Sequence, residues 1–189
     1  MRIETRRLVL RYWRKGDIDD LVEGLNDLRV SRWLALVPYP YTRKDAASWV
    51  RRCEGTATRS GPRASHDFAI EVKATGKVIG GTSLDRIQEL HGTAGGGIWI
   101  SASCHGMGYG SEAYGARSRF AFEDLGLRRL ESGYFKGNAA SSRMHARLGF
   151  RKEGLRVQAL FCRAEKRHKD EVMLALLRQD WARGGRRRP

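Results

Sequence analysis

Short apolar runs alternate with amphipathic stretches along the whole chain, and polar or glycine-containing segments separate them. Apolar residues at every second position, or in short β-branched runs, predict strands, whereas apolar residues three and four positions apart predict helices. We expect strands at residues 8–12, 68–72, 78–84, 97–101, 127–135, 157–162 and 170–177. We expect helices after Asp17, after Thr42, at 111–125 and at 139–148. This order, βααβββαβαββ, predicts an α/β (α+β) fold in which helices cover the faces of a mixed sheet.

Capping and turn residues support several of these boundaries. Asp17 is an N-cap candidate for the first helix, and Thr42 begins the second with Asp45 in the acidic position of a capping box. Gly76 lies between two apolar runs, where a positive φ closes a hairpin. Asn138 is expected to cap the last of the four helices. These signals agree with the periodicity, so the element order does not depend on one kind of evidence.

The 189 residues fit a single domain, which we place at 1–182, with a polar loop at 56–65 inside it. Residues 183–189 are rich in arginine and are expected to form a basic, disordered tail. No apolar run approaches the roughly 20 residues of a membrane helix, and the charged N-terminus does not resemble a signal peptide. We therefore expect a cytoplasmic protein without a membrane partner.

The chain carries 36 Lys and Arg against 21 Asp and Glu, a formal net charge of +15. Such a charge attracts polyanions, including nucleic acid, the ribosome and phosphorylated cofactors, although an arginine-rich solvated surface explains it equally well. The three cysteines, Cys53, Cys104 and Cys162, are widely spaced and form no cluster with histidine. They predict free thiols and no metal site.

A run of alternating glycines is the strongest candidate for chemistry. Gly106, Gly108 and Gly110 follow an expected strand and directly precede an expected helix; residues 106–111 are called the glycine loop below. Glycines allow a ligand to approach the backbone closely, and the free N–H groups at a helix N-terminus attract a phosphate. The spacing matches neither a Walker loop nor a Rossmann fingerprint, and by itself it is also consistent with a flexible turn.

The glycine loop resembles the coenzyme A motif of the GNAT acetyltransferases, (R/Q)-x-x-G-x-(G/A), and most closely that of the RimJ/RimL type. His105 stands where arginine is common, and Gly110 replaces a common alanine. Further resemblances to the same family follow in the family's order at 4–11, 38–42, 78–81, 123–130, 138–150 and 170–181. The resemblance implies a mostly antiparallel sheet of about seven strands, splayed at its middle and flanked by about four helices.

The same resemblance implies acetyl-CoA as the cosubstrate. The main chain of Ile98, Trp99 and Ile100 would bind the pantetheine arm, and one N–H there would polarise the thioester carbonyl. Met107, Gly108, Gly110 and Ser111 would donate N–H groups to the pyrophosphate, and His105, Gly106 and Tyr109 would also contact the coenzyme. Asn138 would contact the pantetheine, although it is equally a plain N-cap. Ser141 matches a hydroxyl that can protonate the leaving thiolate, although it is equally an ordinary polar residue of a first helical turn.

The general base is not evident from the sequence. Some relatives carry a glutamate where this chain has Gly95. Asp85 is the leading substitute, with Glu89 and His91 as further candidates, and each of the three is equally well explained as a solvated loop residue.

These motifs together predict transfer of an acetyl group from acetyl-CoA to a primary amine by direct attack in a ternary complex. The acceptor would be a protein N-terminal amine or a small-molecule amine, and ribosome association and a homodimer are expected of such relatives. The alternative is a catalytically degenerate GNAT module that binds coenzyme A or a polyanionic partner. No helix-turn-helix, zinc-finger or RNP motif supports a dedicated nucleic-acid-binding protein.

Overall fold

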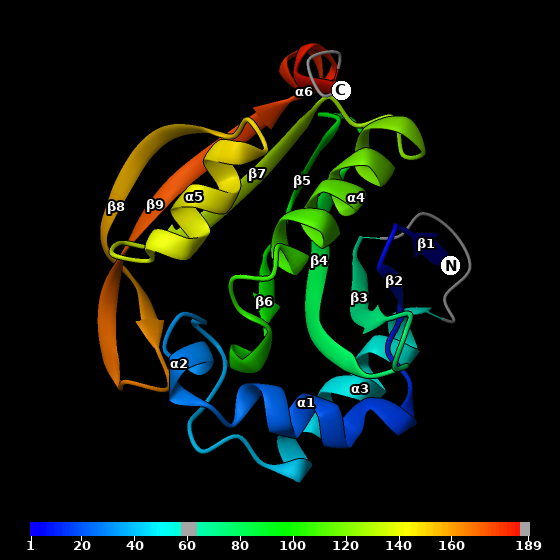
Figure 1. Cartoon of the computed structure of the whole chain (residues 1–189). Coiled ribbons are helices and arrows are strands. Elements are labelled where there is room, and N and C mark those ends of the chain that lie inside the picture. The colour runs from blue at the N-terminus through cyan, green and yellow to red at the C-terminus, as the bar shows by residue number, and fades with distance from the viewer. Residues whose placement is uncertain (58–63, 186–189) are drawn as a thin grey trace.

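A computed structural model describes residues 1–57 and 64–185, which form one mixed sheet with helices on both faces (Figure 1). The strands are β1 (Arg2–Glu4), β2 (Leu8–Tyr12), β3 (His66–Val72), β4 (Val78–Gln88), β5 (Thr93–Gly95), β6 (Ile98–Ile100), β7 (Arg129–Phe135), β8 (Arg151–Cys162) and β9 (Arg167–Leu177). The helices are α1 (Ile18–Leu25), α2 (Leu28–Ser31), α3 (Arg43–Ala57), α4 (Tyr109–Glu123), α5 (Ala139–Arg147) and α6 (Arg178–Gly185). Two 3-10 turns, η1 (Lys15–Asp17) and η2 (Ala102–Cys104), precede α1 and the glycine loop.

The sheet is discontinuous at its middle. Its strand order is β1-β2-β3-β4-β5-β7-β9-β8, and β6 lies off this path because it pairs only with β4. The pairing of β5 with β7 is parallel and covers two residue pairs, while the other pairings are antiparallel. Beyond β5 the chain follows β4 as β6, so β6 and β7 diverge and leave a gap that we call the opening (Figure 1).

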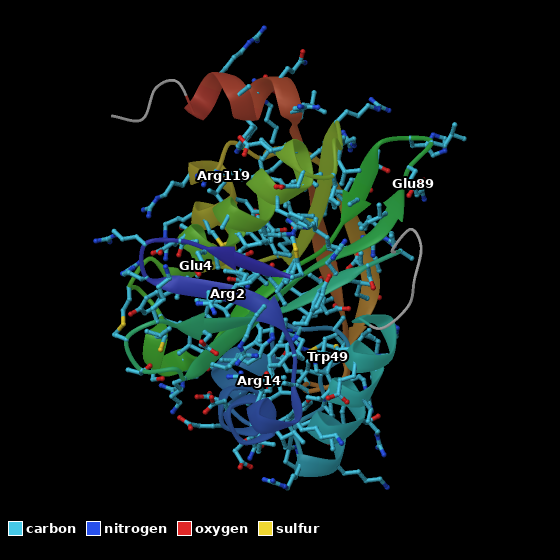
Figure 2. All side chains as sticks on the ribbon, turned by 90° about the vertical axis from the view of Figure 1, so that its right-hand side faces the viewer. Arg2, Glu4, Arg14, Trp49, Glu89 and Arg119 are labelled. Atoms are coloured by element: carbon cyan, nitrogen blue, oxygen red, sulfur yellow. The ribbon has the colours of Figure 1, made fainter. Side chains whose placement is uncertain are left out.

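Two apolar layers hold helices on opposite faces of the sheet. Alternate residues of β3 divide between them: Phe68 and Ile70 join the layer under α4, and Ala69 joins the layer under α1 and α3. This is the period-two alternation of a strand buried on both faces. Polar residues on or next to the sheet and its helices point outward, as Arg119 of α4 and Glu89, which follows β4, do (Figure 2).

The predicted fold class and element order are confirmed, and the differences are short elements and boundaries. The described residues contain nine strands and six helices, because β1, β5, α2 and α6 join the expected set. Of these, β1, β5 and α2 have only three or four residues each, too few to show a periodicity. Helix α4 begins at Tyr109 instead of residue 111, and β8 begins at Arg151 instead of residue 157.

Two local expectations need correction. Asp17 precedes α1, but its carboxylate makes no capping bond there. It is buried and accepts from both terminal nitrogens of Arg11, each at 2.8 Å. Helix α6 extends to Gly185, so residues 183–185 are helical and not part of a disordered tail. The rest of the expected tail, 186–189, and most of the expected loop, 58–63, lie outside the described residues.

The other capping and turn predictions hold. Thr42 and Asp45 exchange capping-box bonds at the start of α3, and Gly76 closes the β3–β4 hairpin with a φ of 69°. Within residues 1–57 and 64–185, none of the helices has the length and apolar character needed to cross a bilayer.

Candidate functional site

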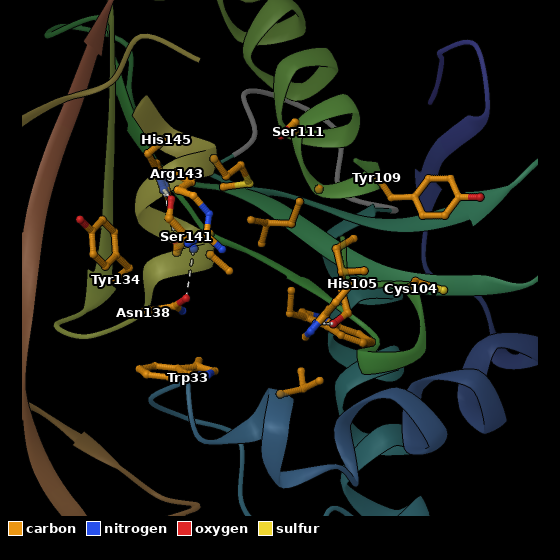
Figure 3. A pocket seen from close by; sticks show the side chains of 18 of the residues that line it. Trp33, Cys104, His105, Tyr109, Ser111, Tyr134, Asn138, Ser141, Arg143 and His145 are labelled. Carbon is orange, nitrogen blue, oxygen red and sulfur yellow. Dashed lines mark hydrogen bonds between the residues drawn. The ribbon is translucent and has the colours of Figure 1, made fainter. Parts of the chain in front are cut away.

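A cavity of about 600 Å³ occupies the opening (Figure 3). Residues far apart in the sequence line it, from α2 and the turn after it, β6, the glycine loop, β7 and α5. The sequence-predicted residues Ile98, Trp99, Ile100, His105, Gly106, Gly108, Tyr109, Gly110, Ser111, Asn138 and Ser141 are all among them. Met107 lies within the loop but not on the cavity wall, and its side chain is half exposed.

The pairing register of β6 decides which of its backbone groups are free. Ser83 N–H donates to the Gly97 carbonyl at 3.1 Å, and Ser101 N–H donates to the Ile79 carbonyl at 2.8 Å. In an antiparallel pair such bonds recur at every second residue, so the Trp99 main chain also faces β4. The main chains of Ile98 and Ile100 therefore face the cavity. Of the three predicted residues, these two can offer hydrogen bonds to a ligand.

The glycine loop presents unsatisfied N–H groups to the cavity. Gly106 and Gly108 have φ values of 78° and 79°, a left-handed conformation that other residues rarely adopt. Gly108 is the N-cap of α4 and supplies no side-chain cap, and the first helical bond runs from Glu112 N–H to the Gly108 carbonyl. The N–H groups of the residues between them have no helical acceptor, and the helix dipole is positive here. The loop can therefore bind an anion through its backbone.

Arg7 of the segment before β2 holds this loop in place. Its Nε donates to Glu112 at 2.7 Å, its Nη1 donates to the Met107 carbonyl at 2.9 Å, and its guanidinium lies 4.3 Å from the centre of the Tyr109 ring. Burial disfavours the charged form of Glu112, but hydrogen bonds from Thr5 and Arg7 outweigh it and hold the pKa of Glu112 below its usual value. The first turn of α4 is thus anchored to the edge of the sheet.

His105, at the position where arginine is common in the family motif, lines the cavity and also bonds to the backbone of β6. Its Nε2 lies 2.8 Å from the Ile100 carbonyl, which can only accept, so that nitrogen carries the proton and donates. The bond occupies the carbonyl of Ile100 and leaves the N–H of that residue for a ligand. His105 therefore links the end of η2 to β6 through this hydrogen bond.

The N-terminus of α5 forms the opposite wall. Asn138 is the predicted N-cap, and its Oδ1 accepts from Ser141 N–H at 3.0 Å (Figure 3). Ser141 is half buried, and its Oγ lies 3.3 Å from Nδ1 of His145, whose stronger bond, at 2.8 Å, is to the Ser141 carbonyl. Because Nδ1 must donate to that carbonyl, the Ser141 hydroxyl keeps its own proton free for the cavity.

A buried polar chain continues from this wall across the opening. His145 Nε2 lies 2.9 Å from Ser132 Oγ, which lies 2.9 Å from the Tyr114 hydroxyl, and that hydroxyl also lies 3.1 Å from the Gly96 carbonyl. Burial lowers the pKa of His145, so the imidazole is neutral at pH 7 and its Nε2 accepts from Ser132. The chain joins α5, β7 and α4 to the backbone between β5 and β6.

Arg117 of α4 supports the other side of the opening. It is completely buried and donates to the Ser83 carbonyl at 2.7 Å and to the Gly95 carbonyl at 2.8 Å. Its position satisfies backbone groups where β5 parts from β7. Sequence reasoning missed Arg7, His145, Ser132, Tyr114 and Arg117, because each acts through a partner distant in sequence.

The three base candidates lie elsewhere. Asp85 pairs with Arg86 at 3.1 Å and faces Gly95, and it does not belong to the described cavity lining. Glu89 and His91 are exposed and equally outside that lining. Over the described parts of the chain, no cluster of three histidine, cysteine or carboxylate side chains is suited to a metal ion.

Comparison with known proteins agrees with this architecture. A family model described as an acetyltransferase (GNAT) domain matches residues 7–151. The uncharacterized N-acetyltransferase p20 of Bacillus licheniformis is 29% identical over 182 residues, which are 94% of this chain and 97% of that protein. RimJ of Mycobacterium smegmatis, solved with CoA-disulfide, has a TM-score of 0.79 at 21% identity over 91% of this chain and 82% of its own. Spermidine N-acetyltransferase of Vibrio cholerae, solved with CoA and spermine, has a TM-score of 0.77 at 19% identity over 94% and 99%.

The match to the family model covers most of the chain, and the relative from Bacillus licheniformis covers nearly all of it. The splayed sheet and its order of elements are shared with both solved structures. This chain belongs to the GNAT family of acetyltransferases, with a RimJ enzyme among its structural neighbours.

Proposed function

We propose that this enzyme transfers the acetyl group of acetyl-CoA to a primary amine by direct attack in a ternary complex. The observation that carries the proposal is the meeting of two sets of free backbone groups in one cavity. The N–H groups of the glycine loop suit a pyrophosphate, and the main chain of Ile98 and Ile100 suits the amides of a pantetheine arm. Family members use acetyl-CoA, and both solved neighbours hold a form of coenzyme A.

The residues around the opening fit the chemistry of the transfer. The thioester carbonyl would accept from the Ile98 N–H, because a fixed dipole stabilises the charge that develops on that oxygen. The Ser141 hydroxyl, with its proton free, would donate to the leaving sulfur. Arg143 lies on α5 across the cavity from the glycine loop and is exposed, so its charge is available to the phosphates (Figure 3).

The acceptor is a protein N-terminal amine or a small-molecule amine. Among the structural neighbours, a ribosomal-protein-S5-alanine acetyltransferase of Vibrio fischeri represents protein acceptors, and spermidine N-acetyltransferase represents small-molecule amines. The net charge of +15 favours the first class and an encounter with an RNA-rich particle such as the ribosome. A homodimer remains part of the same proposal, whereas Asp85 lies outside the described cavity lining and is not assigned the base here.

The test is a calorimetric titration with acetyl-CoA and with free CoA, followed by mass spectrometry of amines incubated with enzyme and acetyl-CoA. Micromolar binding and a mass gain of one acetyl group on an N-terminal peptide or a polyamine support the proposal. Binding without transfer to either class favours a degenerate module. A folded protein that binds neither form of the coenzyme overturns both readings.

A further inference from the structure

The face of the sheet turned away from α4 and α5 carries glycines on both sides of the opening. Gly97 shares a face with Trp99, whose ring packs against Gly24 of α1. Gly133 follows Ser132, whose side chain points toward α5, so Gly133 points toward the same side as Gly97. A Cβ on Gly97 would meet nothing within 4 Å, and Gly133 lines the cavity. At these two positions the cavity is therefore bordered by backbone and not by a side chain of the residue itself. We call this side the acceptor face.

A carboxylate from β9 lies against Gly133 on the acceptor face. Glu171 pairs with Phe135 in the register of β7 and β9, which makes it a diagonal neighbour of Gly133. A Cβ added to Gly133 would lie 2.9 Å from Cδ and 3.1 Å from Cγ of Glu171, and closer still to its Oε1. The carboxylate therefore occupies the space that a side chain at 133 would take, and it does so at the edge of the opening.

The two carboxylate oxygens of Glu171 differ in the hydrogen bonds that they accept. Oε2 accepts from Nη1 of Arg156 at 3.0 Å, which fixes the rotamer. Within the described parts of the chain, Oε1 receives no hydrogen bond, although the side chain is only 14% exposed. A nearly buried carboxylate with one oxygen that accepts no hydrogen bond within the protein can accept one from a bound ligand.

The charged side chains that line the cavity are basic, so a carboxylate close to it differs from them in sign. The described lining contains Arg29, Arg143, Arg147 and two histidines but neither aspartate nor glutamate. An ammonium that approaches such a wall is repelled unless a carboxylate compensates for it. In the turn between β8 and β9, Glu165 is already held by Lys169 and Arg167 at 3.0 and 2.7 Å. Glu171 is not itself in that lining, but it lies against Gly133, which is, so it can provide the missing negative charge.

We propose that Glu171 receives the acceptor ammonium on Oε1 and takes its proton. This inference rests on the proposed acetyl transfer and adds its general base. The ammonium gives one proton to the carboxylate and becomes a neutral amine. Its lone pair then forms the C–N bond to the acetyl carbon as the C–S bond breaks. The second proton of the nitrogen ends on the coenzyme sulfur through Ser141, and Glu171 returns its own proton to solvent.

The first experiment replaces the carboxylate with its neutral isostere. In Glu171→Gln we expect kcat/KM at pH 7 to fall by about 100-fold or more, the usual contribution of a general base. With a peptide acceptor, the loss should shrink as the pH approaches about 8, the ordinary pKa of an α-amino group, because the amine then loses its proton unaided. The probes are an alanine-initiated and a serine-initiated peptide with a free N-terminus and spermidine, each with acetyl-CoA.

A matched control lies on the same face of β7. Glu131 is two residues from Gly133, and its carboxylate binds Arg129 at 3.0 Å. Glu131→Gln also removes one carboxylate from this face, so it controls for the change in charge. It should keep kcat/KM within about twofold of wild type. Both variants should bind acetyl-CoA with unchanged Kd in calorimetry, because neither residue lies on the wall that faces the glycine loop.

A second variant moves the carboxylate without changing it. In Gly133→Ala the new methyl group must push the Glu171 side chain aside, and its free end can move at little cost. We expect a loss of kcat/KM close to that of Glu171→Gln, and little further loss in the double variant. Additive losses would show that Gly133 acts without Glu171.

The outcomes separate this inference from the function on which it rests. A wild-type enzyme that binds no acetyl-CoA, or acetylates none of the three probes, overturns the proposed function and the inference together. An active wild type whose Glu171→Gln variant keeps its kcat/KM and its pH profile overturns the role of Glu171 and leaves the acetyl transfer in place. A pH-dependent loss in Glu171→Gln, absent from Glu131→Gln, supports both.

Discussion

The glycine loop offers a direct test because the same helix carries the same backbone conformation at its other end. Gly108 precedes α4 with a φ of 79°, and Gly126 follows it with a φ of 66°. A Cβ on Gly126 would meet nothing within 4 Å, and one on Gly108 would meet only the end of the Arg7 side chain, at 3.4 Å. Valine at either position therefore introduces strain and almost no steric clash.

The two valine variants should lose similar stability. A residue with a Cβ costs about 1–2 kcal/mol in the left-handed region, and a β-branched one lies at the upper end. For a domain of this size, about 2 kcal/mol lowers Tm by about 4–8 °C. Thermal unfolding followed by circular dichroism measures this shift for Gly108→Val and Gly126→Val.

Their affinities for acetyl-CoA should differ sharply. In Gly108→Val the side chain stands where a pyrophosphate must approach the backbone. The loss of one charge-assisted hydrogen bond, about 1.5–3 kcal/mol, then weakens binding by about tenfold or more. Gly126→Val should bind as wild type, because it lies at the far end of α4. Calorimetry at a temperature where both variants are folded decides the matter, and equal affinities would place the pyrophosphate elsewhere.

Three further predictions concern the cavity and its walls. Iodoacetamide should label the partly exposed Cys104 before Cys53, because burial raises the pKa of the Cys53 thiol to about 12. Saturating acetyl-CoA should slow the labelling of Cys104, which lines the cavity, by about tenfold, and mass spectrometry measures both rates. Because burial lowers the pKa of His145, the unfolded chain binds a proton more readily below about pH 6.5. Urea unfolding should therefore show stability falling from pH 7 to pH 5, with a smaller fall in His145→Gln. Gly110→Ala, whose Cβ would lie 3.5 Å from Met144 Sδ, should raise stability by about 0.5–1 kcal/mol in thermal unfolding and keep acetyl-CoA binding.

The sequence predicts the elements whose signals are local. The capping box of Thr42 and Asp45 and the N-cap Asn138 lie within one helical turn of what they organise, and the structure confirms them. By contrast, β5 has three residues, and its pairing with β7 depends on chain segments more than 30 positions apart. Its glycine-rich sequence carries no strand propensity, so no local rule predicts it.

The same distinction applies to the site. Five of the six glycine-loop residues and Ser141 line one cavity, and the sequence could point to them because their motifs are compact. Arg7 meets Glu112 across 105 positions, and Glu171 meets Gly133 across a strand pair, so neither role follows from spacing. The start of α4 at Tyr109 depends on the left-handed φ of Gly108, which the sequence permits but does not specify.

The narrow connection between the two halves of the sheet has a thermodynamic consequence. Within the described residues, strand pairing joins the halves through two residue pairs of β5 and β7, and side chains of α4 such as Tyr114 add further bonds between them. On the proposed function, the cosubstrate contacts β6 on one side and α5 on the other, and so takes the place of the missing strand pairing. Its binding then stabilises the joined halves by about 2.7 kcal/mol when the free cosubstrate concentration is 100 times its Kd. The two halves of the sheet should therefore be held together more firmly when the cosubstrate is bound than when it is absent.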